Sequence, residues 1–421
     1  MRESGRGLIG TLTVPFLWAG LTLGIWLPLP APAKTHTVTT AGDVGDPNDE
    51  VLSLREAISA AASDDTIAFG ISGQTIALRG PLLLEDSVKL IGPGADDLAI
   101  SGEGSDQILR IGSDATVDLT GLRFINGRTG ILDAAGGGAI SNKGKVTIAK
   151  CSFESNEAQN QRGGAIHNSG QLDLSECFFS KNAVTARSGG AIYNVGSVTA
   201  SKCTFSENAV NEEASSLIGG AAIFNGDGGS ATITECTFTA NRADAGFGRG
   251  AVAHEGGTEL TIVDSTFSGN VCEGSFANGA AIWIKNTVPV EIRNCGFENN
   301  VATEGGGAIF VSGDAKILSC AFTGNRTEDE LGDGGAIRNA SNSMVVIEDG
   351  TFMKNSAAGK GGAVHNGADG SMTLQNCEVT ESFAGRGGAI YCEEGGTVSI
   401  TNCQLISNAS TGDSRRRRHL Q

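Results

Sequence analysis

The chain has 421 residues, of which 62 are glycine, only 8 are proline and 5% are aromatic. Its formal net charge of −17 argues against nucleic acid and anionic lipid surfaces as partners, because both carry charge of the same sign. Many glycines with few prolines indicate closely spaced turns, which excludes a long disordered chain.

Residues 1–33 have the features of a secretory signal peptide. Two arginines stand among the first six residues, a long apolar run follows, and Ala31-Pro32-Ala33 matches a small-residue cleavage site. The alternative is an uncleaved anchor, because the apolar run is nearly long enough to span a bilayer. We expect cleavage, so that the mature chain is secreted or held at the outer-membrane surface and has no transmembrane span.

Residues 34–127 are predicted to form an N-terminal cap and the initial coils of a repeat fold. Ser53 and Glu56 match a capping box at the start of a short helix, which would cover the first coil. A catalytic interpretation of Arg55 and Glu56 is the alternative. The strands predicted after the helix are Thr66–Phe69, Thr75–Leu78, Ser87–Ile91, Leu98–Ser101, Ile108–Ile111 and Ala115–Leu119.

Residues 128–409 contain ten copies of a glycine-small-aliphatic block, spaced 26 to 31 residues apart. The blocks begin at Gly138, Gly164, Gly190, Ala221, Gly250, Ala280, Gly307, Gly335, Gly362 and Gly388. Most are followed by Phe-x-x-Asn, from Phe153…Asn156 onward, and apolar residues alternate with period two. Three short strands in each unit predict one coil of a single-stranded right-handed parallel β-helix, an all-β solenoid. Residues 410–421 are predicted to be a disordered basic tail.

Stacking of the coils predicts three columns of like residues. The Ile or Val of each glycine block, from Ile140 to Ile390, should point into the core. The asparagine that closes each Phe-x-x-Asn block should form an amide ladder at a corner with left-handed backbone. Eight of the ten cysteines stand two residues before the Phe position. We expect a ladder of reduced, buried thiols there; scattered disulfides or a metal site are the alternatives.

The residue after the inward Ile or Val should face outward, and we refer to these residues as the outward column. Every Tyr and Trp of the mature chain lies in this column. Its candidate binding residues are His167, Tyr193, Phe224, Trp283, Phe310, His365 and Tyr391. Exposed aromatic rings in a row stack on sugars or anchor protein partners. The alternative is that the rings only pack on one another and stabilise the sheet.

The repeated Gly-Gly-Ala-Ile and Phe-x-x-Asn blocks resemble those of polymorphic outer-membrane proteins. The stretch Ser53-Leu-Arg-Glu-Ala-Ile58 resembles the C-S-L-R-E-A head of secreted bacterial β-helix proteins, although Leu52 stands where the cysteine of that head should be. The resemblance implies an exported and often adhesive surface protein without a cofactor. The membrane barrel that ends polymorphic outer-membrane proteins is not recognisable in the last twelve residues.

From these observations we expect a non-catalytic, monomeric scaffold that acts in adhesion or recognition of a glycan or protein. We expect no catalytic residue, no metal and no cofactor. The alternative is an extracellular polysaccharide-active β-helix enzyme, either a lyase or a glycoside hydrolase, because β-helices also support such chemistry. The acidic loop Glu328-Asp-Glu330 with Asp333 is a candidate for weak calcium binding, and a solvated loop is the simpler interpretation.

Overall fold

The computed structural model describes residues 32–45, 50–130, 136–211, 219–244, 248–285, 288 and 290–412. The chain divides into a unit of residues Met1–Pro32 and a unit of residues Ala33–Gln421, and only the second is described below. Nearly all of the predicted signal peptide and of the predicted tail fall outside the described residues. Among the residues that are described, no helix has the length and hydropathy needed to cross a bilayer.

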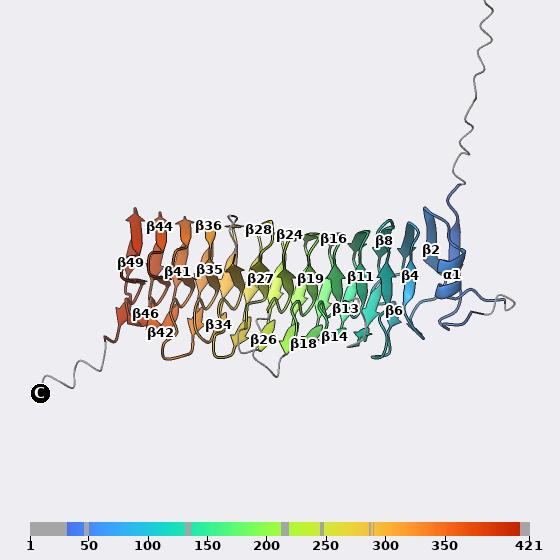
Figure 1. Ribbon diagram of the computed structural model, residues 1–421, viewed down its shortest axis with the longest axis horizontal. Coiled ribbons are helices and arrows are strands. Elements are labelled where there is room, and N and C mark those ends of the chain that lie inside the picture. The colour runs from blue at the N-terminus through green and yellow to red at the C-terminus, as the bar shows by residue number, and fades with distance from the viewer. Residues whose placement is uncertain are drawn as a thin grey trace, which may run out of the picture. The chain divides into compact units, whose positions relative to one another are not determined.

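The second unit confirms the predicted fold class, a right-handed parallel β-helix. Its strands stack in parallel into four sheets, which we name A (14 strands), B (13), C (12) and D (11) (Figure 1). One coil contributes β11 (Ile140–Asn142) to sheet C, β12 (Lys145–Ala149) to sheet A, β13 (Ser152–Glu154) to sheet B and β14 (Glu157–Gln159) to sheet D. The prediction of three strands per coil is therefore wrong. The fourth strand was missed because its one inward residue varies from coil to coil, as at Ala158, Val184 and Thr327, so no repeated block marks it.

The N-terminal cap contains α1 (Leu54–Ala60), the one helix among the described residues. Its capping box is confirmed: the Ser53 side chain accepts from the Glu56 amide, and the Glu56 carboxylate accepts from the Ser53 amide. The helix packs against β1 (Thr35–Val38) and β4 (Leu82–Leu84). Both of these strands were missed. Strand β1 pairs with β2 (Asp65–Phe69) and so begins sheet A ahead of the helix.

Sheet C carries the outward column, and its strands lie in register from coil to coil. They are β4, β7 (Leu109–Ile111), β11, β15 (Ile166–Asn168), β19 (Ile192–Asn194), β23 (Ile223–Asn225), β27 (Val252–Glu255), β31 (Ile282–Lys285), β35 (Ile309–Ser312), β39 (Ile337–Asn339), β43 (Val364–Asn366) and β47 (Ile390–Cys392). Because the register is constant, equivalent residues of successive coils stand side by side.

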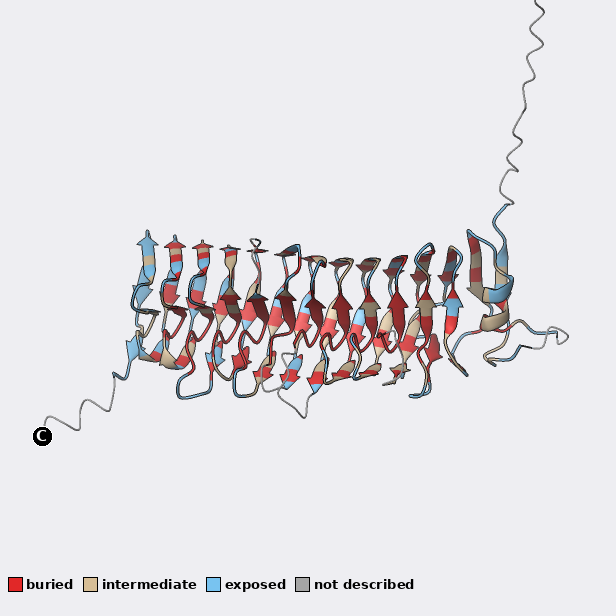
Figure 2. Cartoon of the chain, viewed as in Figure 1, coloured by how far each residue is buried: buried red, intermediate tan, exposed pale blue. Residues whose placement is uncertain are grey.

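The core is built from the predicted columns. Phenylalanine rings from Phe124 to Phe352 stack face to face in sheet B, with centroids 4.6 to 5.1 Å apart. The Ile and Val residues of sheet C are fully buried from Ile140 to Val364 (Figure 2). Core side chains of the last coil are less covered, and Leu405 is 47% exposed. Regular stacking of this kind buries each coil's apolar edge against its neighbours.

The asparagine ladder is confirmed, but its position relative to the corner differs from the prediction. Asn156 Nδ2 donates to Asn182 Oδ1 of the next coil at 2.9 Å and to Phe124 O of the previous coil at 3.0 Å. The left-handed corner residue is the one before the asparagine, as at Ser155 with φ 54°. The asparagine itself is free to turn its amide inward. Each asparagine side chain thereby hydrogen-bonds a backbone carbonyl of the previous coil, and its oxygen accepts from a backbone amide, in a corner that is closed to water.

The cysteine column is also placed as predicted. Cys151, Cys177, Cys203, Cys236, Cys295, Cys320 and Cys377 are buried, Cys403 is half-buried, and all ten cysteines of the chain are free thiols in the structure. Burial raises the pKa of the Cys151 thiol to about 12. These thiols therefore behave as small apolar groups of the core.

Candidate active site

The predicted binding residues of the outward column all lie in sheet C. Register pairs join His167 to Tyr193, Tyr193 to Phe224, and Trp283 to Phe310. Further along, His365 pairs with Tyr391. The structure thus brings the column into one continuous row, but its two halves have different surroundings.

In the N-terminal half the rings pack on one another. The Tyr193 and Phe224 rings are stacked with centroids 5.4 Å apart, and Tyr193, Phe224 and Trp283 are only 6 to 7% exposed. The Arg162 guanidinium lies 4.7 Å from the centre of the Tyr193 ring, and that of Arg249 lies 4.0 Å from the Trp283 ring. This part of the column is packed and covered, so it does not present an open row of rings to a ligand.

The cation over Trp283 is also paired with an acid. Arg249 is 5% exposed and hydrogen-bonds the Glu255 carboxylate, whose second oxygen lies 3.3 Å from Lys285 Nζ. Burial lowers the pKa of Arg249, while Glu255 raises it and so partly offsets that effect. A buried guanidinium with an ionic partner and a ring beneath it is a structural contact.

In the C-terminal half the column borders an open hollow of about 450 Å³ on the outer face of sheet C. Its wall contains Phe310, Arg338 and His365 from the outward column, together with three carboxylates, Glu304, Asp333 and Glu393. Phe310 and Tyr391 are half-buried, in contrast to the covered rings of the other half. Such a concentration of titratable groups in a concave site is typical of active sites.

One side of the hollow is formed by Asn278, Glu304 and Arg338. Asn278 Nδ2 donates to Glu304 Oε2 at 3.1 Å, and Arg338 Nη1 donates to Asn278 Oδ1 at 3.2 Å. Arg338 Nη1 also lies 3.5 Å from Glu304 Oε1. The amide therefore holds a carboxylate and a guanidinium beside each other while both stay partly open to solvent.

The other side is formed by Asp333, Lys360, His365 and Glu393, which come from successive coils. His365 Nε2 lies 3.5 Å from Asp333 Oδ2 and 3.3 Å from Glu393 Oε1. Asp333 Oδ1 accepts from the Lys360 amide at 2.9 Å, and the Lys360 ammonium hydrogen-bonds Glu393. Backbone and ammonium contacts thus fix both carboxylates around one imidazole.

The protonation of these groups follows from burial and charge. Burial lowers the pKa of His365, although Asp333 and Glu393 oppose the shift. Burial raises the pKa of Glu393, but hydrogen bonds from Lys360 and His365 outweigh it and leave that pKa below its ordinary value. The hydrogen bond to Glu393 raises the pKa of Lys360. At neutral pH the imidazole is therefore neutral and the carboxylate ionised.

The sequence prediction missed Arg249 and Lys360 and named Asp333 only together with the acidic loop, although these three residues share one column. Asp333 and Lys360 each stand directly before a glycine pair, and Arg249 stands before the single glycine Gly250. The side chains of all three face the outward column of the next coil. A Cβ at Gly335 would overlap the carbonyl oxygen of Gly362, so the chain runs close to its neighbour here. Tabulating the residue before each glycine pair would have revealed the mixed charges of this column.

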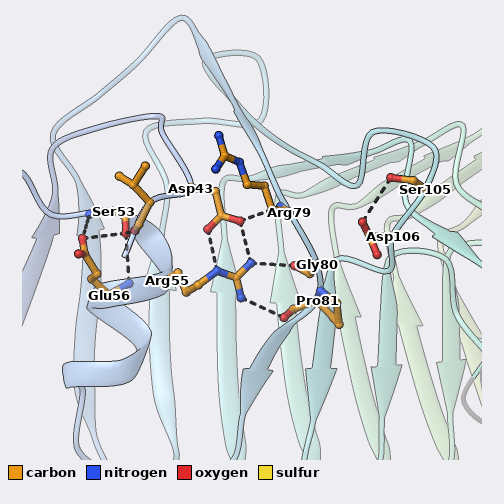
Figure 3. A network of polar contacts seen from close by, with 10 residues as sticks. Asp43, Ser53, Arg55, Glu56, Arg79, Gly80, Pro81, Ser105 and Asp106 are labelled. Atoms are coloured by element: carbon orange, nitrogen blue, oxygen red, sulfur yellow. Dashed lines mark hydrogen bonds and ion pairs between the residues drawn. The ribbon is translucent and has the colours of Figure 1, made fainter. Parts of the chain in front are cut away.

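Other candidates considered in the sequence lie apart from the hollow. Arg55 binds both oxygens of Asp43, at 2.8 and 2.7 Å, and donates to the carbonyls of Gly80 and Pro81 (Figure 3). Burial raises the pKa of Asp43, but Arg55 and the Arg79 amide lower it further than burial raises it. Arg55 therefore ties the N-terminal cap to the chain that follows it.

The acidic loop Glu328-Asp-Glu330 does not join Asp333 in a cation-binding group. Among the described residues, one set of three or more His, Cys, Asp and Glu side chains has the spacing of metal ligands, and it consists of Asp333, His365 and Glu393. Calcium binding by the loop as a unit with Asp333 is therefore not supported.

The sequence and fold were compared with known proteins. The family described as "Right handed beta helix region" matches residues 106–288 and 272–405. No curated protein matches the chain. The catalytic domain of a GH87 alpha-1,3-glucanase in complex with nigerose is similar over 92% of this chain and 70% of its own, with 11% identity and a TM-score of 0.47.

Two further solved structures show the range of similar proteins. PfbA, a surface adhesin of Streptococcus pneumoniae, is 13% identical, with a TM-score of 0.42 over 85% of this chain and 88% of its own. The A-module of the Azotobacter vinelandii mannuronan C-5 epimerase AlgE6 is 13% identical, with a TM-score of 0.42 over 84% and 95%. Identities this low show a shared fold alone.

The expectation of a non-catalytic scaffold for adhesion or recognition is wrong. The solved structures that resemble the chain are mainly catalytic β-helix enzymes, among them glucanases, an epimerase and an alginate lyase. Because the likeness extends only to the fold, the case for an enzyme depends on the side chains of the hollow.

Proposed function

The chain belongs to the right-handed β-helix family, and on that premise we propose that it is a polysaccharide-active enzyme that cleaves glycosidic bonds. The observation that carries the proposal is the hollow on sheet C, where Glu304, Asp333, Lys360, His365 and Glu393 converge from successive coils. Each group can give, take or stabilise a proton or charge, and all of them lie on one open face.

Cleavage of a glycosidic bond needs a group that protonates the leaving oxygen and a second that activates water or removes a ring proton. Glu304 has about a third of its side chain exposed to the hollow, at 30%, and Arg338 lies beside it to stabilise developing charge. The Asp333, His365 and Glu393 group provides the second function. Hydrolysis and elimination both fit this arrangement.

We assign only part of the outward column to contact with the substrate. Phe310 is a half-buried ring in the wall of the hollow, and sugars stack on such faces. Tyr391 is half-buried behind it and stacks on His365. His365 would contact the reacting part of the substrate from the floor. Of the other four predicted residues, Tyr193, Phe224 and Trp283 are covered, so we assign them and His167 to support of the sheet.

We also propose that the enzyme acts outside the cell. Support comes from the signal-peptide features of residues 1–33 and from the similarity of its repeats to those of exported surface proteins. The polymorphic outer-membrane type of the Gly-Gly-Ala-Ile and Phe-x-x-Asn blocks, and the head motif at Ser53, belong to this proposal. A polymeric glycan is the partner that such a location and an open site suggest.

The test is turnover of polysaccharides by the purified chain. Neutral glucans and polyuronates would be incubated with it, and new reducing ends and unsaturated products measured separately. Release of reducing ends without unsaturation indicates hydrolysis, and unsaturation indicates elimination. Glu304→Gln should lower kcat on the responsive polymer by about 10²-fold or more.

The matched control is Glu298→Gln, which changes an exposed glutamate of β33 (Gly296–Glu298) in sheet B. It should leave turnover unchanged. The proposal fails if no polymer is cleaved, or if the Glu304 and Glu298 variants turn over substrate equally well.

A further inference from the structure

We propose that Asp333, His365 and Glu393 bind one transition-metal dication, of the class of Zn²⁺ or Mn²⁺. The site lies within the hollow and so rests on the proposed function for its catalytic meaning, but the binding itself can be measured without any substrate. The metal would be held by one imidazole nitrogen and two carboxylate oxygens from three successive coils.

The separations between ligand atoms fit a bound metal, and the shortest of them is also a long hydrogen bond from His365 to Glu393. Metal–ligand bonds of about 2.0–2.2 Å in a tetrahedral arrangement place neighbouring ligand atoms about 3.3–3.6 Å apart. His365 Nε2 lies 3.3 Å from Glu393 Oε1 and 3.5 Å from Asp333 Oδ2, and the three ligand atoms lie within 4.8 Å of one another. Direct N–H···O bonds are usually 2.7–3.2 Å long.

The burial of His365 is the second observation. Its side chain is 4% exposed, yet its Nδ1 has no hydrogen-bond partner among the described residues. The ring is nevertheless held in place by stacking on Tyr391, with centroids 5.9 Å apart and planes inclined by 3°. It is therefore its Nε2, directed at the two carboxylates, that gives the ring a polar role.

The donor set selects the kind of metal. Calcium prefers six to eight oxygen ligands, whereas an imidazole with two carboxylates suits Zn²⁺, Mn²⁺ and related ions. Metal binding requires a neutral imidazole and ionised carboxylates. Three protein ligands leave a further position open toward the hollow, as in catalytic zinc sites.

Lys360 is the internal competitor of the metal. Its ammonium hydrogen-bonds the same Glu393 oxygen that faces His365, and it lies 5.1 Å from the centre of the Tyr391 ring. In the absence of metal this ammonium compensates the carboxylate charge. A bound dication would displace it from Glu393 and leave Lys360 beside the open coordination position, where it can meet substrate.

The competition separates a metal site from a simple ion-pair network. If the cluster binds a dication, removing the ammonium by Lys360→Gln should tighten binding severalfold, because two uncompensated carboxylates then face the metal. If the cluster is only an ion-pair network, the same change should weaken the fold and create no stoichiometric binding.

The experiment uses the full purified chain after treatment with a chelator. Zn²⁺, Mn²⁺ and Ca²⁺ are titrated by calorimetry, and Co²⁺ is added to read ligand geometry from its visible absorption. We expect one Zn²⁺ or Mn²⁺ per chain, weaker binding of Ca²⁺, and Co²⁺ bands typical of a nitrogen–oxygen site.

His365→Gln and Asp333→Asn should each weaken binding tenfold or more, while Lys360→Gln tightens it. The matched control is His167→Gln, which changes a histidine at the same position of another coil, where the groups that shift its pKa are Arg162 and Lys143. It should leave binding unchanged. Absence of stoichiometric binding, or binding that survives His365→Gln, overturns the proposal and leaves the glycan-cleavage test unaffected.

Discussion

The two halves of the outward column share one backbone and differ in what surrounds them. In the N-terminal half, arginines lie over covered aromatic rings and one of them is neutralised by Glu255. In the C-terminal half, Asp333 and Lys360 stand in the column of the arginines, and His365 stands in the column of the rings. The surface there opens into a hollow. The comparison shows that a repeated scaffold can convert a packing surface into a chemical site by changing the side chains of two adjacent columns.

The physical reason is the coil geometry. The residue before each glycine pair reaches the outward residue of the next coil, so its type decides what that residue meets. An arginine over a ring gives a cation–π contact and closes the surface. An aspartate beside a histidine instead creates a pair of titratable groups in a partly dry site.

Replacing Trp283 and Tyr391 by alanine, one at a time, should give the largest difference in stability between the two halves. Trp283→Ala should cost about 3–5 kcal/mol, because a covered ring is lost together with its contact to Arg249. Tyr391→Ala should cost about 1 kcal/mol, since that ring is half-buried, and should chiefly lower turnover. Denaturant unfolding and polysaccharide assays measure the two effects. Equal losses of stability would show that the halves do not differ in packing.

Alanine at equivalent glycines should show how far the two halves are alike. A Cβ at Gly190 would overlap the Ala221 carbonyl oxygen, and one at Gly335 would overlap that of Gly362. Because alanine occupies the equivalent position at Ala221 and Ala280, the backbone can shift to admit a Cβ, and both changes should destabilise by about 1 kcal/mol, the lower part of the range for overpacking. Unfolding curves of Gly190→Ala and Gly335→Ala should agree. Unequal losses of stability in the two variants would contradict a shared backbone.

The histidines of the two halves should respond differently to pH. Burial, with repulsion from Arg162 and Lys143, lowers the pKa of His167 to about 4, whereas Asp333 and Glu393 oppose the lowering at His365. We expect His365 to titrate at the higher pH in ring resonances measured by NMR. A reversed order would contradict the charge arrangement of the hollow.

The stability consequence of His167 has a definite sign. The pKa of His167 in the folded chain is below the ordinary 6.5, so as the pH falls this histidine is protonated at a higher pH in the unfolded chain than in the folded chain. The contribution of the neutral His167 ring to the free energy of unfolding is fully present above about pH 6.5 and is lost as the pH falls toward 4. Replacement by His167→Gln should flatten this part of the stability profile, measured by denaturant unfolding at several pH values.

The smallest expected effect concerns Arg162, whose guanidinium lies over Tyr193 near the surface. Arg162→Gln should cost about 0.5–1 kcal/mol, the usual value of a partly exposed cation–π contact. Turnover should not change, because the residue is distant along the column from the hollow. A larger loss, or an effect on activity, would show that the N-terminal half also takes part in function.

The sequence alone determined the repeat, the parallel β-helix and the identity of its inner columns. Those features depend on spacing: inward Ile, stacked Phe, corner Asn and buried Cys recur at fixed positions, so each copy supports the same assignment. The capping box at Ser53 was equally local, since its two partners are three residues apart. The strands of sheet D were missed because their inward residue changes between coils, as at Ala158, Val184 and Thr327.

Only the tertiary structure decided which outward residues are covered and which meet in a site. Trp283 and Tyr391 occupy the same repeat position, and nothing local distinguishes a covered ring from one at the edge of a hollow. Asp333, His365 and Glu393 are separated by 60 residues of chain and become neighbours only because successive coils stack in register. Contacts across coils depend on side-chain size and charge in adjacent columns, and it is these contacts that place the chemistry.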